Sequence, residues 1–179
     1  MVLLENESFD GIGKQIHEFM TNLFPICRSI TGNGVRDSLK QIKQHLPNLE
    51  IHEVTSGSEV FDWKIPNEWN IKDAFVKNYK GEKIIDFNDS NLHVLNYSTP
   101  IHTKLHLDEL KKHLFSIEKY PDWIPYKTSY YDQNWGFCLS HNQLINLPED
   151  EYEVLIDSSL EPGFLTYGEL LLKGETDDE

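Results

Sequence analysis

Two amphipathic helices are predicted near the start of the chain, because apolar residues there recur every three or four positions. The first stripe covers about residues 9–24 and is stopped by Pro25, since proline is unfavourable inside a helix. The second covers residues 35–46 and is stopped by Pro47. Between them, residues 27–34 are rich in Gly, Ser, Thr and Asn, a composition typical of a turn.

From Leu49 the spacing of apolar residues changes to two, which is the period of a β-strand. Strand-like segments continue to about residue 100 and are separated by turns rich in Gly, Asn and Ser. We expect a turn or short helix around Trp69. Strands are predicted over residues 49–55, 71–77, 83–87 and 92–97, with a short extended segment at 60–66.

The second half of the chain is less regular. Residues 108–115 have the apolar spacing of a short helix, and residues 126–143 form an aromatic stretch that fits neither a plain helix nor a strand. Residues 152–160 and 164–173 are predicted to be the two strands of a hairpin, joined by a Pro-Gly turn. After Gly174 the chain is acidic, so we expect either a fold that is cut off in the middle or a frayed tail.

The pattern predicts an α+β protein that contains a β-rich module. Strand and turn signals are densest over residues 61–148, which we take as this module. The helices and the first strand occupy residues 1–60, and the last strands occupy residues 149–179. A chain of 179 residues fits one domain, or a small module attached to part of another.

The acidic composition narrows the range of partners. The chain has 30 acidic and 16 basic residues, a net charge of −14, so it should repel nucleic acids and anionic membranes. No secretory signal and no apolar run of membrane-spanning length occur, which favours a cytoplasmic protein. The two cysteines, Cys27 and Cys138, are far apart; free buried thiols are favoured, and a disulfide is the alternative.

The aromatic stretch is the most distinctive segment of the chain. It combines Tyr, Trp, Phe and His side chains with Gly136. Rings with polar tips, beside a glycine that permits close approach of two backbones, suit the wall of a cleft. The alternative is a structural plug that caps a small core.

Two groups of side chains could carry chemistry. His102 and His106 have the spacing of an HExxH zinc site, but Thr103 replaces the glutamate and the segment is not predicted to be helical, so surface histidines are favoured. Cys138 and His141 could form a nucleophile pair, yet on an extended segment residues three apart face opposite sides. The residues therefore predict neither a metal site nor a cysteine hydrolase.

Five long stretches together resemble one family. They read PICRSITGNGVRDSL from Pro25, VFDWKIPNEWNIKDAFV from Val60, IIDFNDSNLHVLNYSTPI from Ile84, PDWIPYKTSYYDQNWGFCLSHNQ from Pro121 and LEPGFLTYGELLLKGETDDE from Leu160. These stretches are similar to bacterial aminopeptidase-like proteins that carry a domain of unknown function inserted in a zinc-peptidase fold of the M28 type. The resemblance extends over nearly the whole chain.

The resemblance implies that residues 1–60 begin a peptidase-like α/β domain, that residues 61–148 are the inserted module, and that residues 149–179 return into the peptidase-like sheet. Full-length members would use a zinc-bound water to attack a peptide-like carbonyl. Their zinc ligands and catalytic carboxylate would follow Glu179, and no residue here matches them, so we expect no catalytic residue and no zinc in this chain. It would then be a truncated N-terminal part, inactive alone, of an enzyme for a peptide or an amide-bearing small molecule.

Four residues are expected to face the cleft of a complete protein. Arg28 could pair with a substrate carboxylate or, alternatively, bond the carbonyls at the end of the first helix. Tyr130, Trp135 and His141 could shape the mouth of the site. The alternative function is a noncatalytic binding or interaction module. Because a truncated sheet exposes an edge and an apolar face, we also expect self-association.

Overall fold

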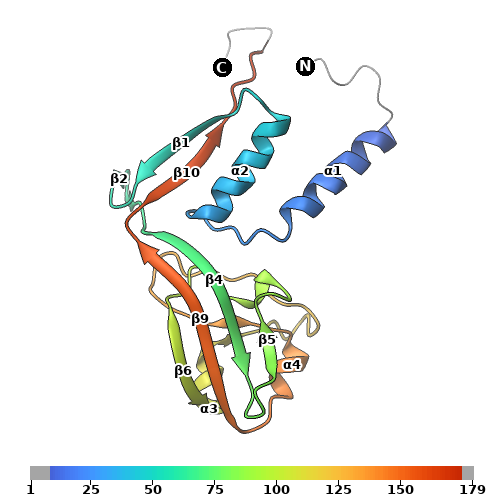
Figure 1. Cartoon of the computed structure of the whole chain (residues 1–179), viewed down its shortest axis with the longest axis vertical. Helices are drawn as coiled ribbons and strands as arrows, with labels where there is room; N and C mark the ends of the chain where they lie inside the picture. Colours follow the sequence, from blue (N-terminus) through green and yellow to red (C-terminus); the bar gives the residue numbers. More distant parts are fainter. Residues whose placement is uncertain (1–8, 175–179) are drawn as a thin grey trace.

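The computed structural model describes residues 9–174 and has two ends of different architecture (Figure 1). One end holds two helices, α1 (Phe9–Leu23) and α2 (Asn33–His45), beside a two-stranded ribbon. The other end is a four-stranded sheet with short helices and loops packed on it. The chain is therefore of mixed α and β structure, as the apolar pattern predicts.

The ribbon joins segments from the two halves of the chain. Strand β1 (Glu50–Thr55) pairs antiparallel with β10 (Phe164–Glu169). Gly168 permits the side chains of Leu39 and Leu49 to approach this ribbon, since an added Cβ would lie 2.9 and 3.2 Å from them. A small hairpin of β2 (Glu59–Val60) and β3 (Trp63–Lys64) follows β1.

The four-stranded sheet is antiparallel throughout, with strand order β5-β4-β9-β6. Its strands are β4 (Glu68–Lys77), β5 (Lys83–Asp86), β6 (Ile101–His106) and β9 (Glu151–Glu161). Shorter elements connect them: η1 (Asn91–His93), α3 (Leu107–Leu110), η2 (Lys111–His113), β7 (Leu114–Phe115), β8 (Phe137–Cys138) and α4 (His141–Ile145). We call residues 68–161 the sheet domain.

The core of the sheet domain lies on the face of the sheet that these short elements cover. It includes Val76 and Val154 from the two central strands, and Phe137 from β8, all fully buried. Alternate residues of β9 are buried, as expected for a strand with one covered face. Apolar burial of this kind is what stabilises the sheet domain.

Polar contacts join the α1–α2 connection to the sheet domain. Thr31 is buried; its Oγ1 accepts a hydrogen bond from the Trp69 backbone N–H at 3.0 Å and lies 3.0 Å from the Tyr97 hydroxyl. The indole Nε1–H of Trp69 donates to the Ser98 carbonyl at 2.9 Å. Nearby, Arg36 of α2 forms a two-point ion pair with Glu68 of β4. These contacts hold the helical end, which comprises α1, α2 and the ribbon, against the sheet domain at the start of β4.

Several elements differ from the sequence prediction. Trp69 lies within β4 and not in a turn, because its side chain is buried and its backbone pairs with Leu160 of β9. Residues 92–97 do not form a strand, and residues 108–115 divide into α3, η2 and β7. Within residues 92–97, isolated bridges of Val94 with Phe137 and of Asn96 with Thr128 take the place of a regular ladder.

The two last strands do not form the predicted hairpin. Strand β9 pairs with β4 and β6, whereas β10 pairs with β1, so the two strands belong to different sheets. The four-stranded sheet consequently continues past residue 148, where the sequence places the end of the β-rich module. Residues 175–179, part of the predicted C-terminal segment, lie outside the described residues.

Candidate functional site

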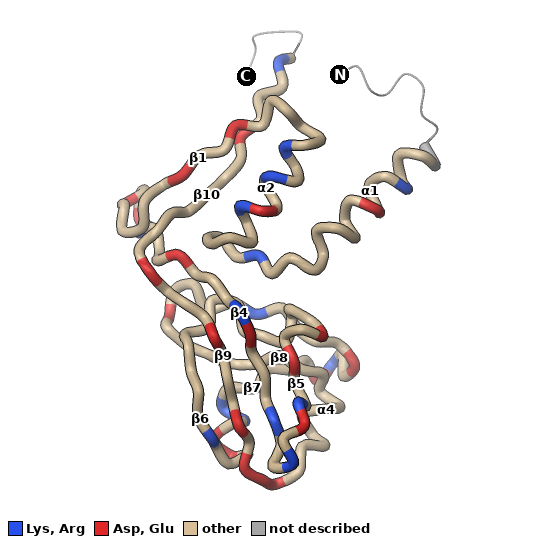
Figure 2. The backbone as a smooth tube through the Cα atoms, viewed as in Figure 1, with Lys and Arg blue, Asp and Glu red and all other residues tan. Residues whose placement is uncertain are grey.

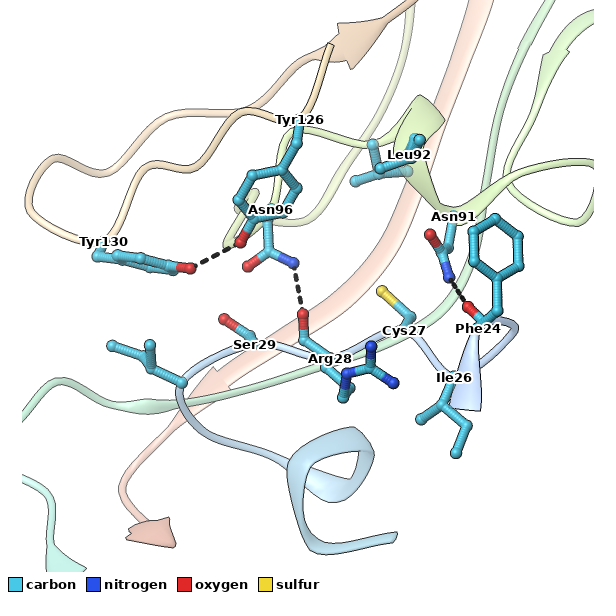
Figure 3. A pocket seen from close by; sticks show the side chains of 12 residues that line it. Phe24, Ile26, Cys27, Arg28, Ser29, Asn91, Leu92, Asn96, Tyr126 and Tyr130 are labelled. Carbon is cyan, nitrogen blue, oxygen red and sulfur yellow. Dashed lines mark hydrogen bonds between the residues drawn. The ribbon is translucent and has the colours of Figure 1, made fainter. Parts of the chain in front are cut away.

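A pocket of about 450 Å³ lies where the α1–α2 connection meets the sheet domain (Figure 3). It is formed by two groups of residues that are far apart in the sequence. The connection contributes Phe24, Ile26, Cys27, Arg28, Ser29 and Ile30, and the sheet domain contributes Asn91, Leu92, Val94, Asn96, Tyr126 and Tyr130. We call it the Asn96 pocket.

Asn96 is the polar side chain that links the walls of this pocket. Its Nδ2 donates to the Arg28 carbonyl at 3.0 Å, its backbone N–H donates to Lys127, and its carbonyl accepts from Ser129. Because a carbonyl can only accept, the bond to Arg28 fixes which end of the Asn96 amide is nitrogen. The other end, Oδ1, is buried and has no hydrogen-bond partner in the described structure.

Two tyrosines form one wall of the pocket. The hydroxyls of Tyr126 and Tyr130 are 2.9 Å apart and share one hydrogen bond. Partial burial of the hydroxyl, together with this bond, raises the pKa of Tyr126 above its ordinary range. The Tyr130 ring also makes an edge contact with Tyr97, with ring centroids 5.3 Å apart. The Tyr126 hydroxyl therefore keeps its proton at neutral pH. Two phenol hydroxyls carry two hydrogens and their shared bond uses one, so the pair keeps one hydrogen for a further contact.

Arg28 is the one charged side chain among the described residues that line the pocket. Its Nη1 donates to the Leu23 carbonyl at 2.6 Å, near the end of α1. The alternative role predicted for Arg28 is thus confirmed, and the remaining guanidinium N–H groups are available for further contacts. Figure 2 shows that Asp and Glu are spread over both ends of the molecule, for example along β1 and β9.

The cysteines are poor candidates for nucleophiles. Burial raises the pKa of Cys27 to about 11, although Arg28 partly opposes the effect, and burial likewise raises the pKa of Cys138 to about 11. Both residues are free cysteines, as favoured from the sequence, and both are thiols at neutral pH. His141, the first residue of α4, makes no hydrogen bond to Cys138 in the described structure; its Nδ1 lies 3.0 Å from the Ser116 hydroxyl instead.

The structure brings together only two of the four residues that the sequence singles out. Arg28 and Tyr130 both line the Asn96 pocket. Trp135 stacks on His113, with ring centroids 3.7 Å apart, and its carbonyl accepts a hydrogen bond from that histidine. Neither Trp135 nor His141 lines the Asn96 pocket. Whether any of the four faces the cleft of a longer protein stays a prediction.

The sequence does not identify two polar residues that line the Asn96 pocket. Ser29 and Asn96 lie in segments that read as a turn and as a strand, and only the fold places them together. Tyr126 belongs to the aromatic stretch, so its residue type did give a signal. The unsatisfied oxygens of Ser29 and Asn96 depend on burial, which a single sequence does not reveal.

The described residues contain no group of three His, Cys, Asp or Glu side chains that could hold a metal ion. His102 and His106 lie on β6, both exposed, and His102 Nε2 is 3.1 Å from a carboxylate oxygen of Glu153. No helix within residues 9–174 has both the length and the apolar character needed to cross a membrane.

Comparison with known proteins gives a peptidase-like relative and a family. A Clostridium acetobutylicum protein described as "Putative polysaccharide biosynthesis protein with aminopeptidase-like domain" is 58% identical over 167 residues, which are 93% of this chain and 38% of that protein. A crystal structure of a "putative peptidase" from the same organism matches with a TM-score of 0.84 and 59% identity, over 88% of this chain and 37% of that one. The chain thus spans less than two fifths of the relatives it matches.

The family comparison concerns the sheet domain. Residues 68–159 match the family described as "Domain of unknown function (DUF2172)". The match covers β4 to β9, including the strands of the four-stranded sheet and the Tyr126 to Tyr130 wall. Because it includes more than half of the residues, the chain belongs to the DUF2172 family.

Proposed function

We propose that this chain serves as the N-terminal portion of an M28-like, zinc-dependent aminopeptidase that hydrolyses a peptide or a related amide in the cytoplasm. The observation that supports the proposal is the similarity, at 58% and 59% identity, to an aminopeptidase-like protein and to a solved peptidase-like structure. The name of the first relative also mentions polysaccharide biosynthesis, so the amide could belong to a modified sugar as well as to a peptide.

The exposed apolar surface of the helical end agrees with this proposal. Ile51 of β1, together with Phe164 and Tyr167 of β10, are each more than one third exposed on a ribbon of only two strands. A two-stranded ribbon is marginal by itself and gains stability when further strands or helices cover it. We infer that residues of a longer protein complete this layer, with α1 and α2 as its first helices.

Zinc has no site in the described part of the chain, since no three ligand side chains gather there. In the proposal, the metal and the general base therefore belong to other segments of a longer protein. The contribution of this chain would be shape and recognition: Arg28 and Tyr130 in the Asn96 pocket, and Trp135 and His141 elsewhere on the sheet domain.

A chimera tests the proposal directly. This chain replaces the matching segment of the Clostridium acetobutylicum relative, which is feasible because 58% of the aligned residues are identical. Zinc content and hydrolysis of aminoacyl anilides are measured for the chimera, the intact relative and this chain alone. We expect zinc and activity in the first two proteins only. A relative without aminopeptidase activity, or stoichiometric zinc in this chain alone, would overturn the proposal.

A noncatalytic binding module is the second candidate function. The observation that favours it is the Asn96 pocket, which holds two buried oxygen atoms without hydrogen-bond partners in the described structure. The chimera separates the two candidates. If the chimera binds a ligand but neither the chimera nor the relative hydrolyses amides, the result supports a binding module without catalysis.

A further inference from the structure

Two buried oxygen atoms of the Asn96 pocket have no partner in the described structure. They are Ser29 Oγ and Asn96 Oδ1, and Asn96 is only 5% exposed. Buried polar groups in folded proteins are nearly always hydrogen-bonded, because their transfer from water without a partner is unfavourable. Figure 3 shows both residues at the same pocket, near Tyr126 and the backbone of Arg28. Both oxygen atoms have almost no accessible surface, so a polar ligand that bonds them has to displace the side chains that cover them.

The donors of the pocket favour an anionic group. Arg28 supplies guanidinium N–H groups beyond the one that bonds Leu23. The pair of Tyr126 and Tyr130 keeps one hydroxyl hydrogen, and Ser29 can donate another. No carboxylate is present among the described lining residues, so nothing there competes for these donors. A carboxylate ligand has two oxygens with about four lone pairs, so it can accept more than one of these hydrogen bonds.

The acceptor without a partner in the described structure, Asn96 Oδ1, requires an N–H group in the ligand. Asn96 Nδ2 is committed to the Arg28 carbonyl, so Oδ1 is the end of the amide that remains for a ligand, and it can only accept. The described lining residues include no carboxylate that could balance a free ammonium of the ligand, whereas an acylated N–H carries no charge. The remaining wall, with Ile26, Leu92 and Val94, is apolar.

We propose that the Asn96 pocket binds a small carboxylate with a neighbouring acylated N–H and an apolar side chain, which is the chemistry of an N-acyl amino acid or of a peptide C-terminus. A volume of about 450 Å³ is within the range of small-molecule sites. The inference does not depend on the hydrolase proposal, because every lining residue belongs to this chain and no metal is involved.

Calorimetric titration of the purified chain with N-acetyl-L-leucine tests the proposal. We expect saturable binding with a Kd on the order of 1 mM, and about tenfold weaker binding of two matched probes, N-acetyl-L-leucinamide, which lacks the carboxylate, and L-leucine, which has an ammonium. Glycyl-glycyl-L-leucine distinguishes the sources: tighter binding identifies a peptide C-terminus, and equal binding a single acylated residue. Equal binding of all probes, or none at about 10 mM, would refute the proposal.

Variants locate the site. Arg28→Met should weaken N-acetyl-L-leucine about tenfold while leaving its amide unchanged, and Ser29→Ala should weaken both the acid and the amide slightly. Lys111→Met, which removes a positive charge from an exposed position on the sheet domain, is the control and should bind normally. If Arg28→Met does not fold, the comparison of acid and amide in the unchanged chain still decides the role of the carboxylate. Normal acid binding by a folded Arg28→Met would contradict the assignment.

Discussion

At the scale of single residues, both the backbone conformation and the packing require a glycine at Gly32. Its φ of 95° and ψ of −177° fall in a region that is essentially restricted to glycine, and a Cβ there would lie 2.0 Å from the Trp69 carbonyl oxygen. Gly32 is also next to Thr31, which bonds Trp69 and Tyr97. A side chain at this position would therefore push the α1–α2 connection away from β4.

We predict that Gly32→Ala lowers the free energy of unfolding by at least about 3 kcal/mol, from backbone strain plus displacement of the connection. Gly81→Ala is the matched control: its φ is 79°, but a Cβ would meet nothing within 4 Å, so the cost should be only about 1 kcal/mol. Urea unfolding of the two variants gives the comparison. If both variants lost the same free energy of unfolding, the contact between the new Cβ and Trp69 would make no contribution to the loss.

At the scale of elements, Glu68 joins three parts of the fold. Its carboxylate bonds Arg36 of α2, with Nη1 to Oε2 at 3.0 Å, and also accepts from the Phe164 backbone N–H at the start of β10. The hydrogen bonds from Arg36 are the main reason why the pKa of Glu68 falls from 4.5 to about 2, with smaller help from Asn70.

The sign of the pH effect follows from this lowered pKa. The Glu68 contacts stabilise the fold fully above the unfolded-state pKa near 4.5, and that stabilisation, at most about 3 kcal/mol, is lost as the pH falls through about 2. Glu68→Gln should therefore be less stable than the wild type at pH 6, and the difference should shrink towards pH 2. Asp37→Asn, at an exposed ion pair with Lys40, should behave like the wild type throughout. Thermal unfolding against pH measures both; a constant difference for Glu68→Gln would contradict the ionisation effect.

The elements also show what the sequence can predict. The two helices and β1 are confirmed within a few residues, because each has a regular apolar period and a clear stop. The apolar pattern also predicts strands β9 and β10, but it does not show which strand pairs with which. The assignment of these two strands to one hairpin is therefore wrong. Residues 92–97 do not form the predicted strand, because Asn96 and Tyr97 use their side chains to bond neighbouring segments and Tyr97 adopts a φ of 74°.

At the scale of the whole molecule, the candidate site depends on a meeting of distant segments. The Asn96 pocket joins residues 24–30 with residues 91–96 and 126–130, and no local pattern predicts that contact. Arg28 and Tyr130 could be chosen by residue type, since charged and aromatic side chains are common at binding sites. Ser29 and Asn96 could not, because their value lies in burial without a partner, which is a property of the fold.

The exposed apolar side chains at the helical end support the prediction of self-association. Ile16 and Met20 are one turn apart on α1, with 55% and 61% of their surfaces exposed, and Ile16 borders a groove that also contains Phe19 and Ile42. Neighbouring apolar groups of this kind lose contact with water when two copies meet, which favours association. The net charge of −14 opposes it, so added salt should strengthen the association by screening.

We therefore expect this chain alone to form concentration-dependent oligomers, and Ile16→Lys combined with Met20→Lys to weaken their association at least about tenfold, since burying each apolar side chain contributes about 1.5–3 kcal/mol. The control is Tyr79→Lys with Trp123→Lys, which makes the same change in charge at exposed aromatic residues of the sheet domain. Sedimentation velocity at two salt concentrations measures the outcome. If the control pair dissociates the oligomer and the α1 pair does not, the contact lies on the sheet domain, and the helical end must be stable in water uncovered.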